Sequence, residues 1–392
     1  RRGGGRGRFG PGQRGNPRFR LLARQLLILA EPRAATVFRR AGYKQYQQEN
    51  NLIRKLSIAL ALALATAAQP ALSDSVEDFY SGRTVTAVIP SSSGGSFDAY
   101  MRLMADHLGK FIPGNPNIVP QNMPGGGGVK ALNYVYNVAP KDGTYLGMPI
   151  HTTLTFGLLN PKRVKFEGPK FNWIGSMAGI HDIIGVWQTT GVKTVGDART
   201  KVVNMGATGR GGNTFLDPVM ANNLLGTKFK VIAGYPGASE INLAIERGEL
   251  GGRASSWEGL ISKKPDWFAD KKFVTLVQIG PDKVPELGDV PSFKEVLQNP
   301  DDEVIVDVLS VGLTLGRALF TTPGTPPERV AALRAAFEKM VKDPAYLADA
   351  KKYRMSVHDP KPGAQIQDIV SKTYQLPKAV LAKAKEALTP KK

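Results

Sequence analysis

The sequence predicts an α/β protein built as two lobes, and three observations point to that class. From Arg83 onward, short apolar segments alternate with helical patterns, which is typical of strand–helix–strand units and a parallel sheet. Glycine-rich loops follow the first two predicted strands, and a similar strand–loop–helix unit begins again near residue 205. The chain has 392 residues, of which 42% are hydrophobic and 22% are charged, so it is long enough for two domains.

The first half of the predicted fold consists of strands and helices in strict alternation. The predicted strands are Thr84–Pro90, Ile118–Gln121 and Tyr145–Ile150, and the helices between them are Asp98–Phe111 and Val129–Val138. In open α/β sheets, ligands bind outside the carboxyl ends of such strands. The loops that follow these strands are therefore the predicted location of a binding site.

The second half repeats this organisation and ends in helices. The predicted strands are Trp173–Met177, Ile183–Trp187, Val202–Ala207, Lys228–Ala233 and Phe273–Gln278, with helices Phe215–Leu225 and Ala238–Arg247 among them. Pro326-Pro327 opens a helix over Glu328–Val341, and Pro344 opens another, because proline is well tolerated in the first helical turn. Two lobes with a cleft between them suit this order of elements.

Charge is concentrated at the start of the chain. Of the formal net charge of +19, residues 1–73 carry +12, with 14 Lys and Arg against 2 Asp and Glu. The remaining +7 gives a modest field that attracts small anions. No stripe of Lys and Arg interleaved with aromatic residues occurs, so we expect no nucleic-acid partner. The chain has no cysteine, which excludes disulfides and thiol chemistry.

A segment around residue 60 has the three-part pattern of a secretory signal peptide. A basic pair at 54–55 precedes an apolar run over 56–68, and Ala71 and Ser73 place small residues before a cleavage point. This apolar run is much shorter than the roughly 20 residues that a membrane-spanning helix needs. We therefore expect residues 52–73 to be a signal peptide cleaved near Ser73. Residues 1–51 are expected to be a non-native or disordered basic extension.

Two glycine-rich loops, each between a strand and a helix, carry most of the chemical information. The first, over 90–98, reads PSSSGGSFD, and the second, over 122–128, reads NMPGGGG. Glycine lets main-chain N–H groups approach a ligand, and the following helix N-terminus adds unpaired donors and positive potential. Three or four such hydrogen bonds to a carboxylate, at about 1.5–3 kcal/mol each, suffice for micromolar affinity. Tight turns without a ligand are the alternative interpretation.

Signatures of nucleotide-binding proteins and of enzymes do not occur in the sequence. The loops lack the Gly-x-Gly-x-x-Gly and Gly-x-x-x-x-Gly-Lys-Ser/Thr spacings, and no Gly-x-Ser-x-Gly elbow is found. The four histidines, His107, His151, His181 and His358, show no metal-ligand spacing. We therefore expect no catalytic residue, no metal and no other cofactor.

A set of short motifs runs in a fixed order along the chain. The set comprises Gly94-Gly95-Ser96-x-Asp98, Asn122-x-Pro124-Gly-Gly-Gly, residues 139–145 (APKDGTY), Tyr235-x-Gly237, Asp289-Val290-Pro291-Ser292 and residues 322–326 (TPGTP). In this order, and over roughly residues 79–350, the motifs resemble those of the tripartite tricarboxylate transporter receptors, the Bug-type periplasmic solute-binding proteins. The resemblance implies a two-lobed type II periplasmic binding protein fold with a ligand cleft between the lobes. It also implies a periplasmic location.

The expected lobes follow from the same comparison. Residues 74–182 are expected to form the N-terminal part of lobe 1, residues 183–305 lobe 2, and residues 306–392 a return to lobe 1 with C-terminal helices. In the family, the glycine loops of the first lobe hold one carboxylate of the ligand, partly through ordered water, and the second lobe selects the rest. Asp98 is expected to N-cap its helix instead of contacting an anion, because a carboxylate would repel the ligand.

In the second lobe, a loop over 206–214 offers further donors. Arg210 is a candidate partner for a second carboxylate of the ligand, with a solvated loop residue as the alternative. The segment 252–257 departs from the commoner family pattern, and Arg253 and Ser256 are expected to reshape the cleft there. The residues expected to contact the ligand are Ser92, Ser93, Gly94, Gly95, Ser96, Asp98, Pro124, Gly125, Gly126, Gly127, Thr152, Thr208, Arg210, Asn213, Thr214, Arg253 and Ser256.

These expectations together describe a non-catalytic receptor. It would capture a small carboxylate, such as a di- or tricarboxylate or a related organic acid, by hinge closure as a monomer. It would deliver this ligand to the membrane permease subunits of a tripartite tricarboxylate transporter. The alternative is a secreted enzyme acting on a small anionic substrate in the same cleft, which requires His151 or His181 beside Ser92 or Ser96.

Overall fold

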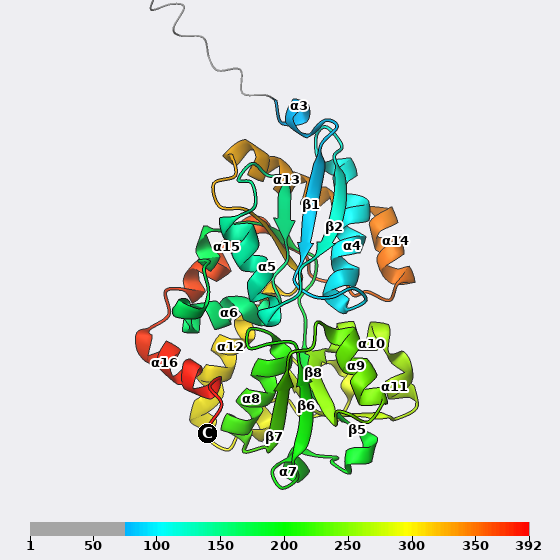
Figure 1. Cartoon of the computed structure of the whole chain (residues 1–392), viewed down its shortest axis with the longest axis vertical. Coiled ribbons are helices and arrows are strands. Elements are labelled where there is room, and N and C mark those ends of the chain that lie inside the picture. The colour runs from blue at the N-terminus through cyan, green and yellow to red at the C-terminus, as the bar shows by residue number, and fades with distance from the viewer. Residues whose placement is uncertain (1–74, 392) are drawn as a thin grey trace, which may run out of the picture. The chain divides into compact units, whose positions relative to one another are not determined.

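Two separate β-sheets, each covered by helices on both faces, organise residues 75–391, the part of the chain that the computed structural model describes (Figure 1). This arrangement confirms the predicted α/β class with two lobes. The predicted extension over 1–51 and the predicted signal peptide over 52–73 lie outside the described residues. Among the described helices, none combines the length and the apolar character needed to cross a membrane.

The first sheet has six strands in the order β11-β4-β10-β3-β1-β2. Its strands are β1 (Thr84–Ile89), β2 (Asn117–Asn122), β3 (Tyr145–Gly147), β4 (Asn172–Ser176), β10 (Ala318–Thr321) and β11 (Lys361–Pro362). Strand β1 pairs in parallel with β2 and β3, whereas β10 runs antiparallel to β3 and β4. The carboxyl ends of β1, β2 and β3 therefore meet at one edge, where the two predicted glycine loops emerge.

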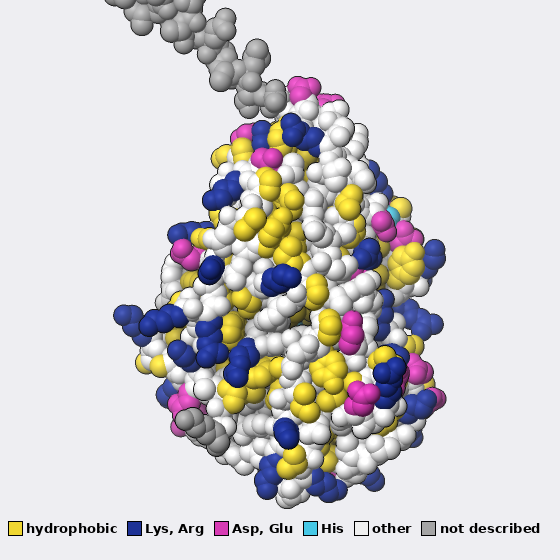
Figure 2. All heavy atoms as spheres, viewed as in Figure 1, with side chains coloured by type: hydrophobic (Ala, Val, Ile, Leu, Met, Phe, Trp, Pro, Cys, Tyr) yellow, Lys and Arg dark blue, Asp and Glu magenta, His cyan; other side chains and the backbone are white. Residues whose placement is uncertain are grey.

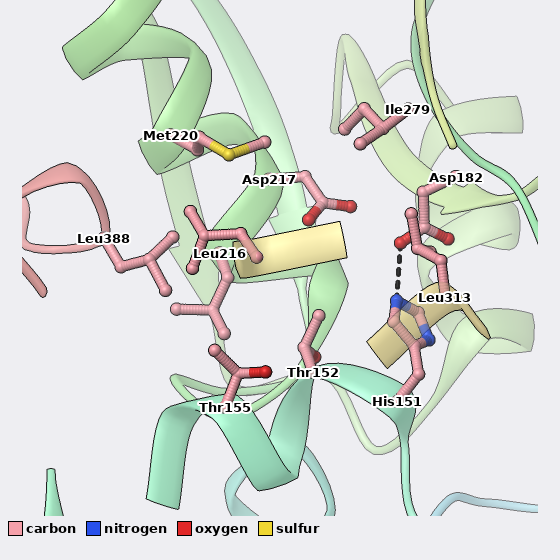
Figure 3. A pocket seen from close by; sticks show the side chains of 11 residues that line it. His151, Thr152, Thr155, Asp182, Leu216, Asp217, Met220, Ile279, Leu313 and Leu388 are labelled. Atoms are coloured by element: carbon pink, nitrogen blue, oxygen red, sulfur yellow. Dashed lines mark hydrogen bonds and ion pairs between the residues drawn. The ribbon is translucent and has the colours of Figure 1, made fainter. Parts of the chain in front are cut away.

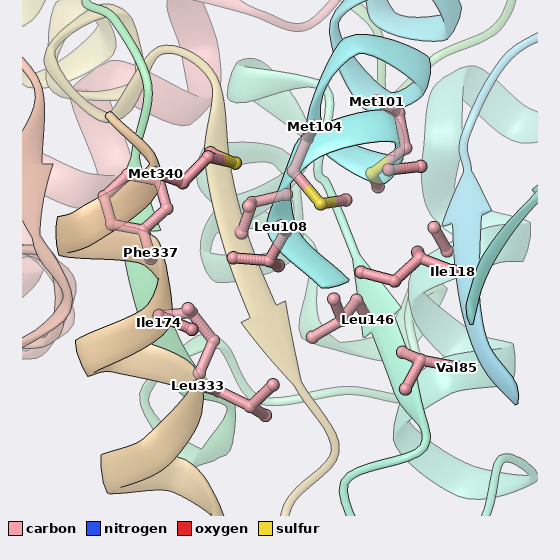
Figure 4. Close-up of a cluster of buried hydrophobic side chains, with 14 of the residues drawn as sticks. Val85, Met101, Met104, Leu108, Ile118, Leu146, Ile174, Leu333, Phe337 and Met340 are labelled. Atoms are coloured by element: carbon pink, nitrogen blue, oxygen red, sulfur yellow. The ribbon is translucent and has the colours of Figure 1, made fainter. Parts of the chain in front are cut away.

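Helices cover both faces of the first sheet. One face packs against α3 (Val76–Tyr80), α4 (Ser96–Leu108), α13 (Pro327–Met340) and α14 (Pro344–Lys352). Figure 4 shows side chains from α4 and α13 meeting over the strands, and those drawn by name, such as Met104 and Phe337, are fully buried. The other face packs against α5 (Val129–Asn137), α6 (His151–Leu159) and α15 (Gly363–Thr373).

The second sheet has five strands in the order β7-β6-β8-β5-β9. Its strands are β5 (Asp182–Trp187), β6 (Val203–Ala207), β7 (Phe229–Ala233), β8 (Gly252–Ser256) and β9 (Phe273–Ile279). Strand β6 pairs in parallel with β7 and β8, and β5 lies antiparallel between β8 and β9. The loops after β6, β7 and β8 face the glycine loops of the first lobe.

The helices of the second lobe also lie on two faces. The helices α7 (Val195–Ala198), α8 (Asn213–Leu225), α12 (Glu303–Leu315) and α16 (Lys378–Ala387) cover one face, and α9 (Ala238–Glu246), α10 (Trp257–Lys263) and α11 (Pro265–Ala269) cover the other. We expected all of 306–392 to return to lobe 1. Within that segment, residues 306–315 of α12 and helix α16, through Ala384 and Ala387, instead pack in the core of the second lobe. The lobe boundaries as moving bodies stay a prediction.

Helix α6 differs from the sequence-based expectation. The predicted strand over Tyr145–Ile150 ends at Gly147, and the chain then enters a helix at His151. All residues of this helix except Leu158 are buried, so it carries no alternation of polar and apolar residues with a helical period. A helix that is buried on every side lacks the pattern by which sequence identifies helices.

Two connections between the sheets lie side by side, and we call this pair of segments the hinge. Residues 177–181 lead from β4 to β5, and Gly316 and Arg317 lead from the end of α12 to β10. The N–H of Arg317 donates to the Ala178 carbonyl at 2.9 Å, and the Ile180 N–H donates to the Leu313 carbonyl at 3.1 Å. The chain crosses between the lobes a third time between α15 and α16. Any lobe motion must bend these short connections.

Candidate functional site

The first glycine loop, over residues 91–95, connects β1 to α4 and lies against α9 of the second lobe. Ser92 Oγ donates to Glu240 Oε2 at 2.8 Å, and Ser239 Oγ donates to the Ser93 carbonyl at 3.5 Å. Helix α4 begins after Gly95, and its N-terminus has no side-chain cap. The N–H groups of this first turn are therefore available to an anion in the cleft.

Asp98 does not N-cap α4 as expected. The helix begins at Ser96, so Asp98 lies within its first turn, and its Oδ2 accepts from the Gly94 N–H at 2.9 Å. Its Oδ1 accepts from Arg102 at 3.0 Å and from Asn122 at 2.9 Å. Burial alone would raise the pKa of Asp98, but these hydrogen bonds outweigh it and lower the pKa. Asp98 therefore holds the first glycine loop in place through Gly94, and it does not cap the N-terminus of α4.

The second glycine loop, which begins at Pro124, presses directly against the second lobe. Its four glycines, over 125–128, all have positive φ, a conformation that other residues adopt only at a cost. The Gly211 N–H donates to the Gly126 carbonyl at 3.2 Å, and Thr152 Oγ1 donates to the Gly211 carbonyl at 3.0 Å. A Cβ added at Gly127 would lie 2.8 Å from the Gly209 carbonyl oxygen. The two lobes are therefore in contact at this loop.

In the second-lobe loop over 208–214, the predicted ligand donors bond to the protein itself. Thr214 Oγ1 accepts from the Thr208 N–H at 3.1 Å, and Asn213 Nδ2 donates to Asp182 Oδ1 at 3.1 Å. Arg210 is exposed, and its guanidinium lies 5.2 Å from the centre of the Phe215 ring. Arg210 borders a separate pocket of about 390 Å³, on the side of α6 and the C-terminal segment.

A pocket of about 320 Å³ lies between the first glycine loop and the second lobe. Lobe 1 contributes the open N-terminus of α4, and lobe 2 contributes α9, β8 and α10. The lining residues are Gly94, Gly95, Ser96, Ala238, Ser239, Asn242, Leu243, Glu246, Arg253, Ser255, Gly259, Leu260, Lys263 and Lys264. Four residues predicted to contact the ligand thus meet here: three from the first loop and Arg253.

Arg253 is a buried cation within this pocket wall. Its Nη1 donates to Asn242 Oδ1 at 2.6 Å and to the Ala238 carbonyl at 3.1 Å, and its Nε donates to the Ala254 carbonyl at 3.0 Å. No described carboxylate forms an ion pair with it, and burial lowers its pKa to about 10. Lys264 pairs with Glu246 at 2.6 Å, so Arg253 and Lys263 leave the pocket with excess positive charge.

A second, smaller cavity of about 20 Å³, with room for about one water molecule, lies deeper between α6, α8 and α12 (Figure 3). His151 Nε2 lies 2.6 Å from Asp182 Oδ2 there, and Asp217 points toward the same space. Burial, and then the charge of Asp182, raise the pKa of Asp217 well above its ordinary value. Burial also acts to raise the pKa of Asp182, but the His151 charge and hydrogen bond outweigh it. These opposite shifts favour retention of the proton by Asp217 and ionisation of Asp182.

His181, at the hinge, is held between two carboxylates. Its Nδ1 lies 2.9 Å from Glu258 Oε1 and its Nε2 lies 2.8 Å from Asp282 Oδ1. The hydrogen bond to Glu258 is the main cause that raises the pKa of His181 to about 9. His181 is therefore a cation at neutral pH, placed between two carboxyl groups.

The sequence did not identify Lys263, Lys264 or the residues of α9 as part of a site. Lys263 and Lys264 follow no glycine loop, and charged residues on short helices are common on protein surfaces. The pocket arises because β8 directs α10 toward the first loop. The available sequence signal was the Tyr235-x-Gly237 motif, which directly precedes α9.

Comparison with known proteins agrees with this architecture. No protein-family model matches the sequence. A protein of Cupriavidus necator, described as the UPF0065 protein in gbd 5′region, is 27% identical over 350 residues, which cover 86% of this chain and 98% of that protein.

Solved structures show the same fold. The periplasmic binding protein BugD superposes with a TM-score of 0.64 at 18% identity, covering 80% of this chain and 100% of that one. MatC from Rhodopseudomonas palustris, solved with bound malate, gives a TM-score of 0.61 at 19% identity, covering 79% of this chain and 99% of that one. The chain therefore has the fold of the Bug-type periplasmic binding proteins, and the resemblance expected from its sequence is confirmed.

Proposed function

We propose that this protein is a non-catalytic solute receptor that encloses a small carboxylate between its two lobes. The observation that carries the proposal is the pocket of about 320 Å³ in which the open N-terminus of α4 faces the buried Arg253. Main-chain N–H groups and a guanidinium are the donors that carboxylates prefer. A ligand bound by both would contact both lobes at once.

The charge of the pocket favours an anion. Arg253, Lys263 and Lys264 are opposed by Glu246, the one carboxylate among the lining residues. On the face drawn in Figure 2, more Lys and Arg than Asp and Glu side chains are visible, in a scattered distribution. A positive field of this kind raises the local concentration of small anions and their rate of association.

Closure of the lobes supplies the mechanism. Hydrogen bonds already join the lobes at Ser92–Glu240 and Gly126–Gly211, and both are made by loops at the carboxyl ends of strands. A ligand that binds both lobes stabilises the closed form by its differential affinity for that form. The closed form would then be the one that a membrane partner recognises.

We extend the proposal to the location, ligand class and membrane partner of the protein. The protein would act in the periplasm as a monomer and deliver a di- or tricarboxylate, or a related organic acid, to permease subunits of a tripartite tricarboxylate transporter. The shared fold with MatC, solved with malate, supports a carboxylate ligand. We also propose that Thr208, Asn213 and Thr214 contact the ligand when the lobes are further apart, since Asn213 and Thr214 bond to the protein itself in this structure.

An enzyme in the same cleft is less well supported. That alternative needs His151 or His181 beside Ser92 or Ser96. In the described residues, His151 bonds to Asp182, His181 bonds to Glu258 and Asp282, and Ser92 donates to Glu240. A pairing of nucleophile and base is not formed at the first loop.

Thermal unfolding against a panel of small acids tests the proposal. A ligand present at 100 times its dissociation constant adds about 2.7 kcal/mol to the free energy of unfolding. We expect one chemical group of acids, among mono-, di- and tricarboxylates, to raise the unfolding midpoint. If no acid shifts the midpoint of folded, ligand-free protein, the receptor function is refuted.

A further inference from the structure

Arg317 occupies an unusual position at the junction of the hinge and both lobes. Its backbone belongs to the hinge, where it exchanges hydrogen bonds with residues 177–178. Its side chain is fully buried, and its Nη2 donates to Ser256 Oγ of the second lobe at 2.9 Å. The same nitrogen lies 3.5 Å from Ser96 Oγ, at the start of α4 in the first lobe. Arg317 thus contacts the hinge through its backbone and both lobes through its guanidinium.

This guanidinium is incompletely paired. Its Nε and Nη1 have no hydrogen-bond partner among the described residues, and no described Asp or Glu forms an ion pair with it. The rings of Phe97 and Tyr100 lie against it, with their centres 4.3 Å and 4.7 Å from Cζ. Cation–π contacts offset part of the cost of burial, but they leave the N–H groups without acceptors. A buried charge in this state needs an anion.

The surroundings of Arg317 supply further donors. Ser96 lines the interlobe pocket, and Ser256 follows Ser255, which also lines it. Gly259 lies between these groups, since a Cβ added there would stand 2.6 Å from both Ser96 Oγ and Ser256 Oγ. Arg253, the other buried arginine without a carboxylate partner, reaches Ser255 Oγ at 3.4 Å. Two arginines without a carboxylate partner therefore contact the serines beside the pocket, Arg317 at Ser96 and Ser256 and Arg253 at Ser255.

We propose that Arg317, together with the hydroxyls of Ser96 and Ser256, forms an anion subsite at the hinge that receives a carboxylate of the ligand. The three groups come together only when the lobes meet. A carboxylate held there links the hinge to both lobes, so binding of the charge and closure become one event. This inference rests on the proposed receptor function and names residues that would make it sensitive to ligand charge.

The test is isothermal titration calorimetry of the full chain with malate, adipate, citrate and butyrate, repeated for Arg317→Gln. For the acid that binds the natural protein, we expect Arg317→Gln to weaken binding at least tenfold, which corresponds to about 1.4 kcal/mol. The matched control is Arg83→Gln, since the Arg83 guanidinium also lies over a ring, that of Phe79 at 4.5 Å, but is exposed. The control should bind within twofold of the natural protein.

Thermal unfolding separates a binding role from a structural one. Without ligand, Arg317→Gln should unfold at the same or a higher temperature, because an uncompensated buried charge has been removed. A lower midpoint combined with unchanged affinity would show that Arg317 only supports the fold, and would overturn the proposal. Should Arg317→Gln fail to fold, Ser256→Ala removes one hydroxyl of the same subsite, and unchanged affinity in that variant would also overturn it.

The outcomes distinguish this inference from the proposed function. If the natural protein binds none of the acids, the receptor function fails and the subsite fails with it. If the natural protein binds an acid and Arg317→Gln binds it equally well, the receptor function stands and the Arg317 subsite is refuted.

Discussion

Substituting Gly127 by alanine should separate lobe closure from folding. Gly127 has a φ of +66° and lies in the second glycine loop, where it meets the 209–212 loop of the other lobe. An added Cβ would lie 2.8 Å from the Gly209 carbonyl oxygen and 2.9 Å from the Gly211 carbonyl carbon. Both atoms belong to the backbone, so the overlap is relieved only if one loop shifts away from the other, which opposes contact between the lobes.

Gly82 offers a matched control for this experiment. It has nearly the same φ, +67°, but a Cβ added there would meet no atom within 4 Å. A left-handed alanine costs about 1–2 kcal/mol, so both variants should lose about that much free energy of unfolding. The difference between the two variants then reports the contact between the lobes.

The expected result concerns ligand affinity and compaction. Suppose that only closed molecules bind the ligand tightly and that Gly127→Ala lowers the fraction of molecules able to close to about one per cent. The apparent dissociation constant then rises about 100-fold. Calorimetry with the acid identified in the screen measures that change, and small-angle X-ray scattering measures the decrease in radius of gyration on binding. Gly82→Ala should retain both responses. If Gly127→Ala binds and compacts like Gly82→Ala, closure does not require contact at this loop.

Three further expectations follow from individual side chains. Asp98→Asn should lower the free energy of unfolding by about 1–3 kcal/mol, measured by urea titration at neutral pH. Because the pKa of Asp98 is lowered in the folded protein, the contribution of Asp98 to stability is present above the ordinary aspartate pKa and is lost as the pH falls below it. Since the pKa of His181 is raised to about 9, the contribution of His181 to the free energy of unfolding is complete below about pH 6.5 and should be lost as the pH rises through 9. Glu258→Gln should flatten this pH dependence when unfolding is measured from pH 6 to 10. Asp217→Asn should change the free energy of unfolding by less than about 1 kcal/mol, because an amide replaces a protonated carboxyl, whereas Asp182→Asn should cost more; equal losses in denaturant titrations would contradict the assigned protonation states.

The fold was predictable where its signals are local. The strands at Thr84, Ile118 and Val203 were placed within about a residue or two, because apolar β-branched runs end at glycine-rich turns there. The first glycine loop was correctly placed between a strand and a helix. Gly94 has a positive φ there, and because glycine is the residue that adopts such a φ at least cost, the turn can be recognised from the sequence.

The rest depended on contacts that no local pattern records. Arg317 meets Ser96 across 221 positions of sequence, and Asp217 meets Asp182 through the packing of a helix on a strand. Arg210 and Arg253 were both predicted to contact the ligand, but Arg210 is exposed and Arg253 is buried in the pocket wall. Sequence gives the charge of a side chain, whereas its solvation and partners are properties of tertiary structure.

The C-terminal helix α16 places the two ends of the described chain on different lobes. Helix α3 packs in the core of the first lobe, whereas α16 packs in that of the second. Glu77 and Lys383 are exposed on these two helices, and the chain contains no cysteine. Cysteines introduced at these two positions would carry a pair of fluorescent dyes with no competing thiol. Fluorescence energy transfer between the two dyes would then report the distance between the lobes in single molecules, and so each opening and closing.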